Sequence, residues 1–552
     1  MSRNGRIGRL LRTVRPLGLR QGIAQLVHSI RGLRRPPVAR GPAPQLSTGD
    51  AISAFLPGPR HAHWLPSGEL ELIRRRVDFS GGVNWGYREE GPLWLYHLNQ
   101  CDHLRSPTLS AGQRLSLMLD WVRNCSAGAG WDPHPTSLRI LSWGKILLTP
   151  GAIEATAAEK GEILASMARQ LDGLQRNLEV RLGANHLLSN LIGLVFGGLL
   201  LDGPRADGWL ANEAKLRAEL ASQFGPDGAH EERSPMYHAL LLENLLDLVN
   251  LARARDQRAP GQLVEALADT AASALAPLPV WRHPDGEIAL FGDSALGIAH
   301  PPDALEEYAR ALGVRAPSPQ TPGLLETSGF ARLEGGPFSL VASFAGPGPA
   351  HQPGHAHCDA LSFELACAGE RVVCDTGVHS YELGEPRRIA RATRSHATLE
   401  VGGAEQAEIW AAHRVGGRPR VALARFEPGR FLEATCASWS TPDSVHRRRF
   451  SLMGEELEIR DSLEGTPRRV CLVLPLAPGA EPRLAHAQDG GVEAHISLPG
   501  GGRLRVALPI SADWRIERAP YYPEFGSETD RACLVGDAER FESGTWRFDL
   551  GG

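Results

Sequence analysis

Residues 187–201 and 237–252 read LLSNLIGLVFGGLLL and YHALLLENLLDLVNLA, and their leucines recur at the three- and four-residue spacing of a helix. Such spacing places apolar side chains along one face of a helix that packs against its neighbours. The same texture runs from about residue 109 to about residue 278, interrupted by short polar or Pro/Gly turns. Ser234 and Pro235 suit the start of the last run, because serine caps a helix and proline fits its first turn. The sequence therefore predicts an all-α domain.

Beyond about Ser328 the sequence changes to short segments that are rich in strand-forming residues and bounded by Gly or Pro. These segments are FSLVASF (338–344), LSFELAC (361–367), RVVCD (371–375), ATLEVGG (397–403), RRRFSLM (447–453), LEIRDSL (457–463), RVCLVLPL (469–476) and RLRVALPI (503–510). A Pro- and Gly-rich stretch, about 277–322, separates them from the helical region and is typical of a connection. We therefore predict an α+β multidomain protein, in which the all-α domain precedes an antiparallel β-sandwich.

The chain has 552 residues, more than a single hydrophobic core usually organises, so two or more domains are expected. Its 42% hydrophobic and 22% charged residues are typical of a globular protein. The formal net charge of -4 gives no general electrostatic case for binding nucleic acid, so local positive groups must hold any polyanionic substrate. Eight scattered cysteines, without a CxxC pair, indicate mostly free thiols in a reducing compartment.

The first forty residues carry ten arginines, at a spacing of three over positions 3 to 15, and no acidic residue. No long apolar segment follows, which argues against a secretory signal peptide and against a transmembrane helix. We therefore predict a basic arm over residues 1–45, mobile or lying on the surface, in a cytoplasmic protein. In an alternative interpretation the arm contacts a membrane surface or an anionic polymer, which would give peripheral membrane association.

Polar residues cluster in the segment HQPGHAHCD of the β-region. They are His351, His355, His357 and Asp359. Histidines two residues apart point to the same side of an extended segment, which suits shared work on a ligand or a metal. Gly354 would permit close backbone approach at such a site, whereas the simpler interpretation is a loop with surface histidines.

In the helical region, Asn185 and His186 stand at the start of an apolar helix, where a polar pair can simply be a cap. Tyr237 lies on an otherwise apolar helical face, where a tyrosine is more often a core residue than a catalyst. Taken alone, these residues leave both a structural and a catalytic role open.

Five stretches, in this order along the chain, resemble the successive motif blocks of the heparinase II/III superfamily. They are GANHLLSNLIGLVFGGLLL (183–201), PDGAHEERSPMYHALLLENL (226–245), GHAHCDALSFEL (354–365), VVCDTGVHSY (372–381) and TRSHATLEVGGAEQAEIW (393–410). Two earlier stretches, LWLYHLNQCDHL (93–104) and WDPHPTSLRILSWGKILL (131–148), resemble helical segments of bacterial members. The resemblance implies an incomplete (α/α) toroid over residues 46–325, followed by a β-sandwich over residues 326–552.

The resemblance also implies a polysaccharide lyase that cleaves uronic-acid-containing polysaccharides, such as glycosaminoglycans, alginate or exopolysaccharides, by β-elimination. That reaction requires the uronate carboxylate to be neutralised, the C5 proton to be removed and the departing O4 to be protonated. Asn185, with His186 beside it, resembles the carboxylate-neutralising position of the family. Tyr237 resembles its catalytic tyrosine, which can act first as base and then as acid. His355 resembles a histidine that reaches from the β-domain to the toroid cleft, where it could serve as base for the opposite C5 epimer.

His357, Asp375 and His396 resemble the metal ligands of the family, which implies one structural divalent ion, zinc, and no organic cofactor. Simple strand geometry raises an obstacle to this site. A hairpin turning near residues 368–369 would put Asp375 opposite about Ser362, roughly 17 Å from His357 at about 3.3 Å per residue. The chain that follows His357 must therefore bend for the three ligands to meet.

We expect His97, Asn99 and Arg233 to contact an anionic oligosaccharide or polysaccharide substrate. Two alternatives stay open: a non-catalytic or biosynthetic carbohydrate-binding relative acting in exopolysaccharide production, and a toroid glycoside hydrolase. A hydrolase would need two carboxylates at the cleft. The candidates for them are Glu231, Glu232 and Asp227.

Overall fold

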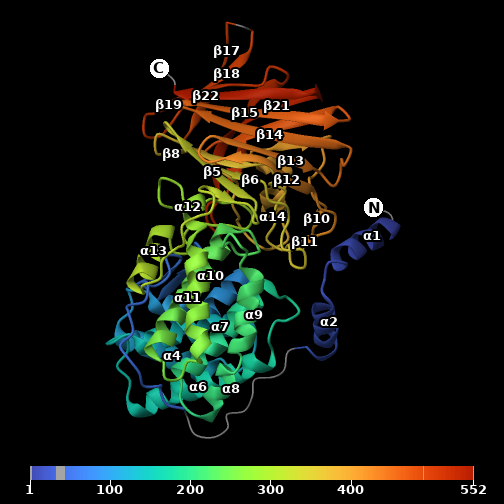
Figure 1. Ribbon diagram of the computed structural model, residues 1–552. Coiled ribbons are helices and arrows are strands. Elements are labelled where there is room, and N and C mark those ends of the chain that lie inside the picture. The colour runs from blue at the N-terminus through green and yellow to red at the C-terminus, as the bar shows by residue number, and fades with distance from the viewer. Residues whose placement is uncertain (1–2, 33–43, 489, 551–552) are drawn as a thin grey trace.

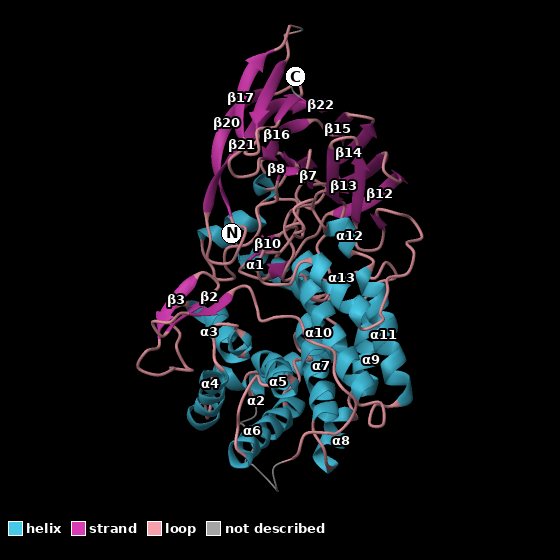
Figure 2. Ribbon diagram, turned by 90° about the vertical axis from the view of Figure 1, so that its left-hand side faces the viewer, coloured by secondary structure: helices cyan, strands magenta, loops and turns pink. Residues whose placement is uncertain are grey.

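The computed structural model describes residues 3–32, 44–488 and 490–550. Helices gather at one end of the molecule and sheets at the other, as Figures 1 and 2 show from two sides. The last long helix before the sheets is α13 (Pro302–Ala311), and the short strand β4 (Leu324–Leu325) follows it. The predicted fold class, a helical toroid followed by an antiparallel β-sandwich, is confirmed.

The helical half is organised around α7 (Ala184–Leu200), which packs against α5 and α10. Nearly all of its residues are buried, which explains why its sequence is apolar on every side. The other helices of this half are α3 (Gly91–Gln100), α4 (Ala111–Asn124), α5 (Pro133–Leu148), α6 (Ala157–Arg176), α8 (Pro204–Leu210), α9 (Glu213–Gln223), α10 (Pro235–Ala254), α11 (Gly261–Leu275) and α12 (Leu278–Trp281).

Side-chain caps fix where several of these helices begin. The predicted start of α10 is confirmed, because Ser234 is its N-cap and its hydroxyl accepts a hydrogen bond from the backbone N–H of Tyr237 at 3.2 Å. Ser110 and Thr156 cap α4 and α6 in the same way, each within a reciprocal capping box. The cap of α10 matters for function because it sets the position of Tyr237.

The C-terminal half consists of antiparallel sheets. A five-stranded sheet has the order β4-β5-β6-β7-β8, an eight-stranded sheet the order β12-β13-β14-β15-β22-β19-β18-β17, and a four-stranded sheet the order β20-β21-β16-β9. The strands are β5 (Phe330–Gly335), β6 (Phe338–Ser343), β7 (Phe363–Cys367), β8 (Glu370–Val373), β9 (Leu399–Val401), β12 (Arg420–Glu427), β13 (Phe431–Ala437), β14 (Ser444–Met453), β15 (Glu456–Gly465), β16 (Arg468–Pro475), β17 (Glu481–His486), β18 (Val492–Ser497), β19 (Arg503–Ala507), β20 (Asp513–Tyr521), β21 (Thr529–Phe541) and β22 (Ser543–Leu550).

Smaller elements complete the two halves. A three-stranded sheet, β1 (Ala62–Trp64), β2 (Glu69–Leu72) and β3 (Arg75–Asp78), lies beside the helices. In the C-terminal half, β10 (Ile409–Trp410) pairs with β11 (Arg414–Val415), and the short helix α14 (Glu385–Arg391) precedes β9. Two large apolar clusters, one among the helices and one between the sheets, form the main cores. All eight cysteines are buried and free, as the sequence predicts.

One helical stretch of the described chain, Gly261–Trp281, has the length and apolar composition of a membrane-spanning segment, with a mean hydropathy of 1.3. It comprises α11 and α12, and α11 packs against α10 and α9. Leu263 and Leu267 on α11 are fully buried in the helical core. This packing accounts for the apolar composition of the stretch without a membrane.

Part of the predicted basic arm is helical. It forms α1 (Arg3–Val14) and α2 (Leu19–Arg31), which lie along one side of the molecule in Figure 1. The rest of the predicted arm includes residues 1–2 and 33–43, which lie outside the described residues.

Candidate active site between the two halves

A cavity of about 140 Å³ lies where the helical half meets the C-terminal half. Asn185 of α7 and Tyr237 of α10 line it from the helical side. Tyr381 and Phe525, from loops of the C-terminal half, line it from the other side. Three of the four predicted catalytic positions, Asn185, Tyr237 and His355, come together at this cavity, because His355 contacts the other two.

Asn185 is held by the carboxylate of Glu232, which was a candidate residue only for a hydrolase. Its side-chain nitrogen lies 2.9 and 2.7 Å from the two carboxylate oxygens of Glu232 and 3.5 Å from Nε2 of His355. The amide therefore faces Glu232 on one side and the imidazole on the other. Burial alone would raise the pKa of Glu232, but His355, His230 and Asn185 lower it, so the carboxylate stays ionised and orients the amide.

His355 is fixed from behind by Asp293. Its Nδ1 lies 2.8 Å from Oδ2 of Asp293, and the backbone N–H of Asp293 donates to the His355 carbonyl at 2.9 Å. Arg387 contacts both oxygens of the same carboxylate. Burial would raise the pKa of Asp293, but Arg387 and the two histidines that it binds hold that pKa well below its usual value. An ionised Asp293 accepts a hydrogen bond from Nδ1–H of His355, so in the neutral imidazole the lone pair is on Nε2, facing Asn185.

Tyr237 lies against His355, with 4.1 Å between the ring centroids. Its hydroxyl makes a 2.8 Å hydrogen bond with the hydroxyl of Tyr381. Burial raises the pKa of Tyr237 far above its usual value, and it also raises the pKa of Tyr381. Tyr237 is therefore a neutral phenol in the free protein, ready to give a proton rather than to take one.

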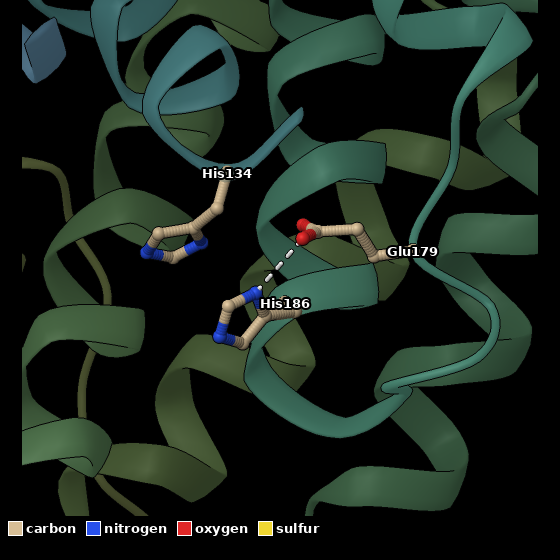
Figure 3. A group of neighbouring side chains, drawn as sticks. All are labelled: His134, Glu179 and His186. Atoms are coloured by element: carbon tan, nitrogen blue, oxygen red, sulfur yellow. Dashed lines mark ion pairs between the residues drawn. The ribbon is translucent and has the colours of Figure 1, made fainter. Parts of the chain in front are cut away.

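His186, the neighbour of Asn185, belongs to a group with His134 and Glu179 (Figure 3). Its Nδ1 lies 3.2 Å from Oε1 of Glu179, and its ring centroid lies 4.4 Å from that of His134. Burial would lower the pKa of His186, but Glu179 raises it above the usual value, whereas burial lowers the pKa of His134 to about 3. The positive charge of His186 and the negative charge of Glu179 thus balance each other beside Asn185.

The predicted metal ligands His357, Asp375 and His396 meet behind His355, with their candidate ligand atoms within 4.8 Å of one another. The required bend exists, because the N–H of Ser362 donates to the Asp359 carbonyl across a turn in which Leu361 has a φ of 61°. This turn precedes β7 and brings His357 back toward Asp375.

These three side chains fit a bound cation. All three are buried, and among the described residues Nδ1 of His357 and Nε2 of His396 have no hydrogen-bond partner. The other ring nitrogens are engaged: Nε2 of His357 lies 2.9 Å from Asp293, and Nδ1 of His396 lies 2.8 Å from Asp375. Two imidazole nitrogens and a carboxylate are a donor set that zinc accepts.

The structure contradicts the prediction that Asn99 contacts substrate. Its side-chain nitrogen donates to the carbonyls of Trp85 and Leu95, both at 3.0 Å, and its oxygen accepts from the indole N–H of Trp121 at 3.2 Å. The side chain is fully buried. Asn99 therefore braces α3 against the rest of the toroid.

Arg233 also departs from its predicted role. Its guanidinium donates to the carbonyls of Gly346 at 2.7 Å and Thr327 at 3.5 Å, so it ties the turn before α10 to the C-terminal half. His97, the third predicted substrate contact, does line the cavity, where its ring packs 4.7 Å from that of His61.

Four residues of the site were not assigned to it from the sequence. Tyr381 ends the quoted block VVCDTGVHSY and could have been found there, and Glu232 stands in the block that contains Tyr237. Asp293 and Arg387 carry no periodic signal, since the first lies in the Pro- and Gly-rich connection and the second in a short helix. Only the folded chain brings these two to His355.

Two family models match the chain in the order of its two halves. Residues 154–310 match the model described as heparinase II/III N-terminus, and residues 318–540 match that described as heparinase II/III-like, C-terminal. The chain belongs to the heparinase II/III-like family. The family is the one that the sequence motifs resemble, and the order of its two models along the chain is that of the predicted helical and sheet halves.

Solved structures of heparinase II/III-like proteins share the fold. A crystal structure of heparinase III superposes with a TM-score of 0.65 at 17% identity, covering 86% of this chain and 80% of that chain. The heparan sulfate lyase HepC from Pedobacter heparinus superposes with a TM-score of 0.56 at 17% identity, covering 86% and 79%. At this identity the likeness concerns the fold and not the substrate.

Among curated proteins, FtsZ-localized protein C from Caulobacter vibrioides is 25% identical over 370 residues. The aligned region covers 64% of this chain and 61% of that relative. The match therefore spans less than two thirds of the relative's length.

Proposed function

We propose that this heparinase II/III-like protein is a polysaccharide lyase that cleaves uronic-acid polysaccharides by β-elimination and leaves 4,5-unsaturated uronate ends. The observation that carries the proposal is the convergence of three groups at one cavity. The amide of Asn185 faces Nε2 of His355 at 3.5 Å, and the phenol of Tyr237 stacks beside the same imidazole. A carboxylate binder, a base and an acid are the groups that β-elimination requires.

Asn185 and His186 would hold the uronate carboxylate. Glu232 occupies one side of the Asn185 amide, so the N–H on the side of His355 is the one available to substrate. A hydrogen bond from this amide becomes stronger as negative charge builds up on the carboxylate during removal of the C5 proton. Glu179 raises the pKa of His186 against the effect of burial, so the neighbouring imidazole can donate to the carboxylate as a cation whose charge Glu179 balances.

His355 and Tyr237 would divide the proton transfers. The proton on C5 moves to Nε2 of His355, the C4–C5 double bond forms as the C4–O4 bond breaks, and the phenol of Tyr237 protonates O4. Solvent then restores both side chains to their starting states. This order differs from a tyrosine that serves first as base, because burial raises the pKa of Tyr237 and favours the neutral phenol.

The charges of the cavity favour a substrate with carboxylates and few sulfates. Apart from histidines and tyrosines, the ionisable side chains of the described residues that line the cavity are Asp102, Lys145 and Glu243. Nζ of Lys145 lies 3.2 Å from Glu243 and 2.6 Å from Asp247, so its positive charge is already neutralised. A heavily sulfated chain would place uncompensated negative charge beside Asp102 and Glu243.

The test is a panel of alginate, hyaluronan, chondroitin, heparan-type chains and bacterial exopolysaccharides, followed by ultraviolet absorbance of the new double bond. We expect turnover on at least one unsulfated uronate polymer, faster than on its sulfated counterparts. Absence of absorbance on every polymer, with the protein folded and loaded with metal, would support a second candidate, a non-catalytic carbohydrate-binding protein of exopolysaccharide production.

The hydrolase alternative has less support from the structure. Asp227 accepts hydrogen bonds from the backbone N–H and the hydroxyl of Ser328, away from the cavity, and Glu232 is bound to Asn185. Burial and the neighbouring carboxylates raise the pKa of Glu231 to about 8, but Glu231 faces His351 at 3.6 Å and does not line the cavity. The carboxylates that do line the cavity, Asp102 and Glu243, have lowered pKa values, because neighbouring cations outweigh the effect of burial. Neither of them is suited to be the protonated acid that glycoside hydrolysis needs.

His355→Ala should impair the cleavage of one C5 epimer more than that of the other, because the C5 protons of glucuronate-type and iduronate-type sugars lie on opposite faces. We expect the two kcat values to fall by factors that differ by about tenfold or more, since one base cannot reach both faces equally. His351→Ala is the matched control, as this histidine lies in the same loop and faces Glu231. Equal losses on both epimers would reject the assignment of His355 as a base that reaches one face of C5 in preference to the other.

For the cofactor, we propose that His357, Asp375 and His396 hold one structural zinc ion. A cation there would neutralise the buried carboxylate of Asp375 and order the loop that carries His355, and the proton transfers would remain with His355 and Tyr237. Zinc would cross-link the loop that carries His355 to the turn that follows β8, and it would not act as a Lewis acid.

His396→Ala should lose the zinc, and with it thermal stability and lyase activity together. Elemental analysis of the purified protein should find about one zinc per wild-type chain and much less in the variant. His134→Ala is the control, because it removes an imidazole from the second His/Glu group and should keep the zinc. Sub-stoichiometric zinc in the wild type, or equal zinc in His396→Ala, would contradict the assignment.

A further inference from the structure

The two N-terminal helices expose an unusual number of large apolar side chains. In α1 and α2 these residues are 39% to 82% exposed. They are Ile7, Leu10, Leu11, Val14, Leu19, Ile23, Leu26, Val27 and Ile30. Figure 1 shows both helices along one side of the molecule, outside the bundle of toroid helices.

The exposed apolar residues form one face on each helix. In α1 they stand at positions 7, 10, 11 and 14, and in α2 at positions 19, 23, 26, 27 and 30. Spacings of three and four residues keep side chains on the same side of a helix with 3.6 residues per turn. Each helix therefore presents a continuous apolar stripe to solvent.

The polar side of each helix is the side that contacts the protein. In α1, Arg9 and Arg12 pair with Glu408, and the hydroxyl of Thr13 accepts a hydrogen bond from the indole N–H of Trp410 at 3.0 Å. In α2, the buried side chain of Gln21 donates to the carbonyl of Leu182 at 3.3 Å. A helix that packs on its own protein normally turns its apolar face inward. Both helices here are oriented the other way.

The charge around this apolar surface is positive. The first forty residues contain ten arginines and no acidic residue. In the described part, Arg15 is exposed between the two helices, and Arg20 is exposed on α2 and lies 3.4 Å from Glu219. Arginines beside an outward apolar stripe complement a surface that is apolar inside and anionic at its rim. An anionic phospholipid bilayer has both properties, whereas an anionic polysaccharide would leave the apolar stripes in water.

We propose that α1 and α2 together form a docking surface for anionic phospholipid bilayers. The leucine and isoleucine side chains insert into the boundary between head groups and acyl chains, and the exposed arginines contact the lipid phosphates. The polar contacts with Glu408 and Leu182 hold the two helices on the protein while their apolar faces lie in the membrane. The chain then binds the membrane surface reversibly, without a spanning segment.

The test is flotation of the full-length protein with vesicles of phosphatidylcholine alone or of phosphatidylcholine mixed with phosphatidylglycerol. We expect binding to the anionic vesicles that weakens as salt is raised, and much weaker binding to the neutral ones. The double variant Ile23→Asn, Leu26→Asn should lower the partition onto anionic vesicles about tenfold or more. Ile510→Asn is the matched control, since it makes the same change at a 75% exposed isoleucine in the sandwich half, and it should bind like wild type.

The circular dichroism spectrum and any lyase activity should be the same in both variants as in the wild type, because these side chains lie outside the cavity. Equal flotation of the double variant and the wild type would overturn the proposal, and so would absence of wild-type binding to anionic vesicles. Self-association in size-exclusion chromatography that disappears in the double variant, without vesicle binding, would instead assign the apolar surface to a second copy of the chain. None of these outcomes depends on whether the protein is a lyase.

Discussion

Tyr237→Phe is expected to abolish turnover while leaving substrate binding nearly intact. The ring still packs on His355, but the hydroxyl that would protonate O4 is gone. Removing a group that transfers a proton typically costs about 10² to 10⁴ in rate, and here the loss should appear in kcat with little change in KM. Steady-state kinetics, followed by the absorbance of the unsaturated product, measures kcat and KM. Binding of an oligosaccharide that is not cleaved measures the affinity for substrate separately.

The control is Tyr96→Phe, which removes a hydroxyl that is hydrogen bonded to Asp132 at 2.9 Å. It should retain nearly all activity, because Tyr96 is outside the group formed by Asn185, His355 and Tyr237. If Tyr237→Phe keeps more than about a tenth of the wild-type kcat, a barrier change under about 1.4 kcal/mol, Tyr237 is not the proton donor.

Asp293→Asn should have the largest effect on stability. The carboxylate is fully buried and binds Arg387, His355 and His357 together, so its loss leaves a buried guanidinium without a counter-charge. Breaking a buried ion pair in this way costs about 3–5 kcal/mol. Denaturant unfolding should show this loss, and activity per folded molecule should also fall, because His355 loses the partner that fixes its protonated nitrogen.

The variant Asp461→Asn separates the loss of stability from the loss of activity per folded molecule. Asp461 is equally buried in the sandwich, where it binds Arg448 and His446, and it is remote from the cavity. This variant should lose comparable stability but keep its activity per folded molecule. A destabilised Asp293→Asn with normal activity would mean that Asp293 supports the fold and does not position His355.

The helical and sheet halves were predictable because their signals are local. The cap at Ser234 and the leucine spacing of α10 lie within twenty residues of one another, so the sequence could place Tyr237 near the start of a helix. Asn185 and His186 were likewise placed at the start of α7. What could not be predicted from local pattern is which distant side chain each of them meets.

Asp293 and Asn99 show two reasons why the sequence did not place every residue of the site correctly. Asp293 lies in an irregular connection, and its role exists only because His355 and Arg387, far along the chain, fold onto it. Asn99 stands on a helix near the cavity, but its side chain turns inward to bond the backbone and Trp121. Side-chain direction and long-range pairing depend on tertiary packing, which a motif does not encode.

The division of the cavity between two halves bears on how such proteins can diverge. Tyr237 and Asn185 come from the toroid, Tyr381 and Phe525 from the other half, and Asp293 from the connection between them. Recombination that exchanged one half for that of a distant homologue would keep two intact folds and still separate the acid from its hydrogen-bond partner. The two halves have separate hydrophobic cores, but a working cavity requires a toroid and a sheet half that fit each other.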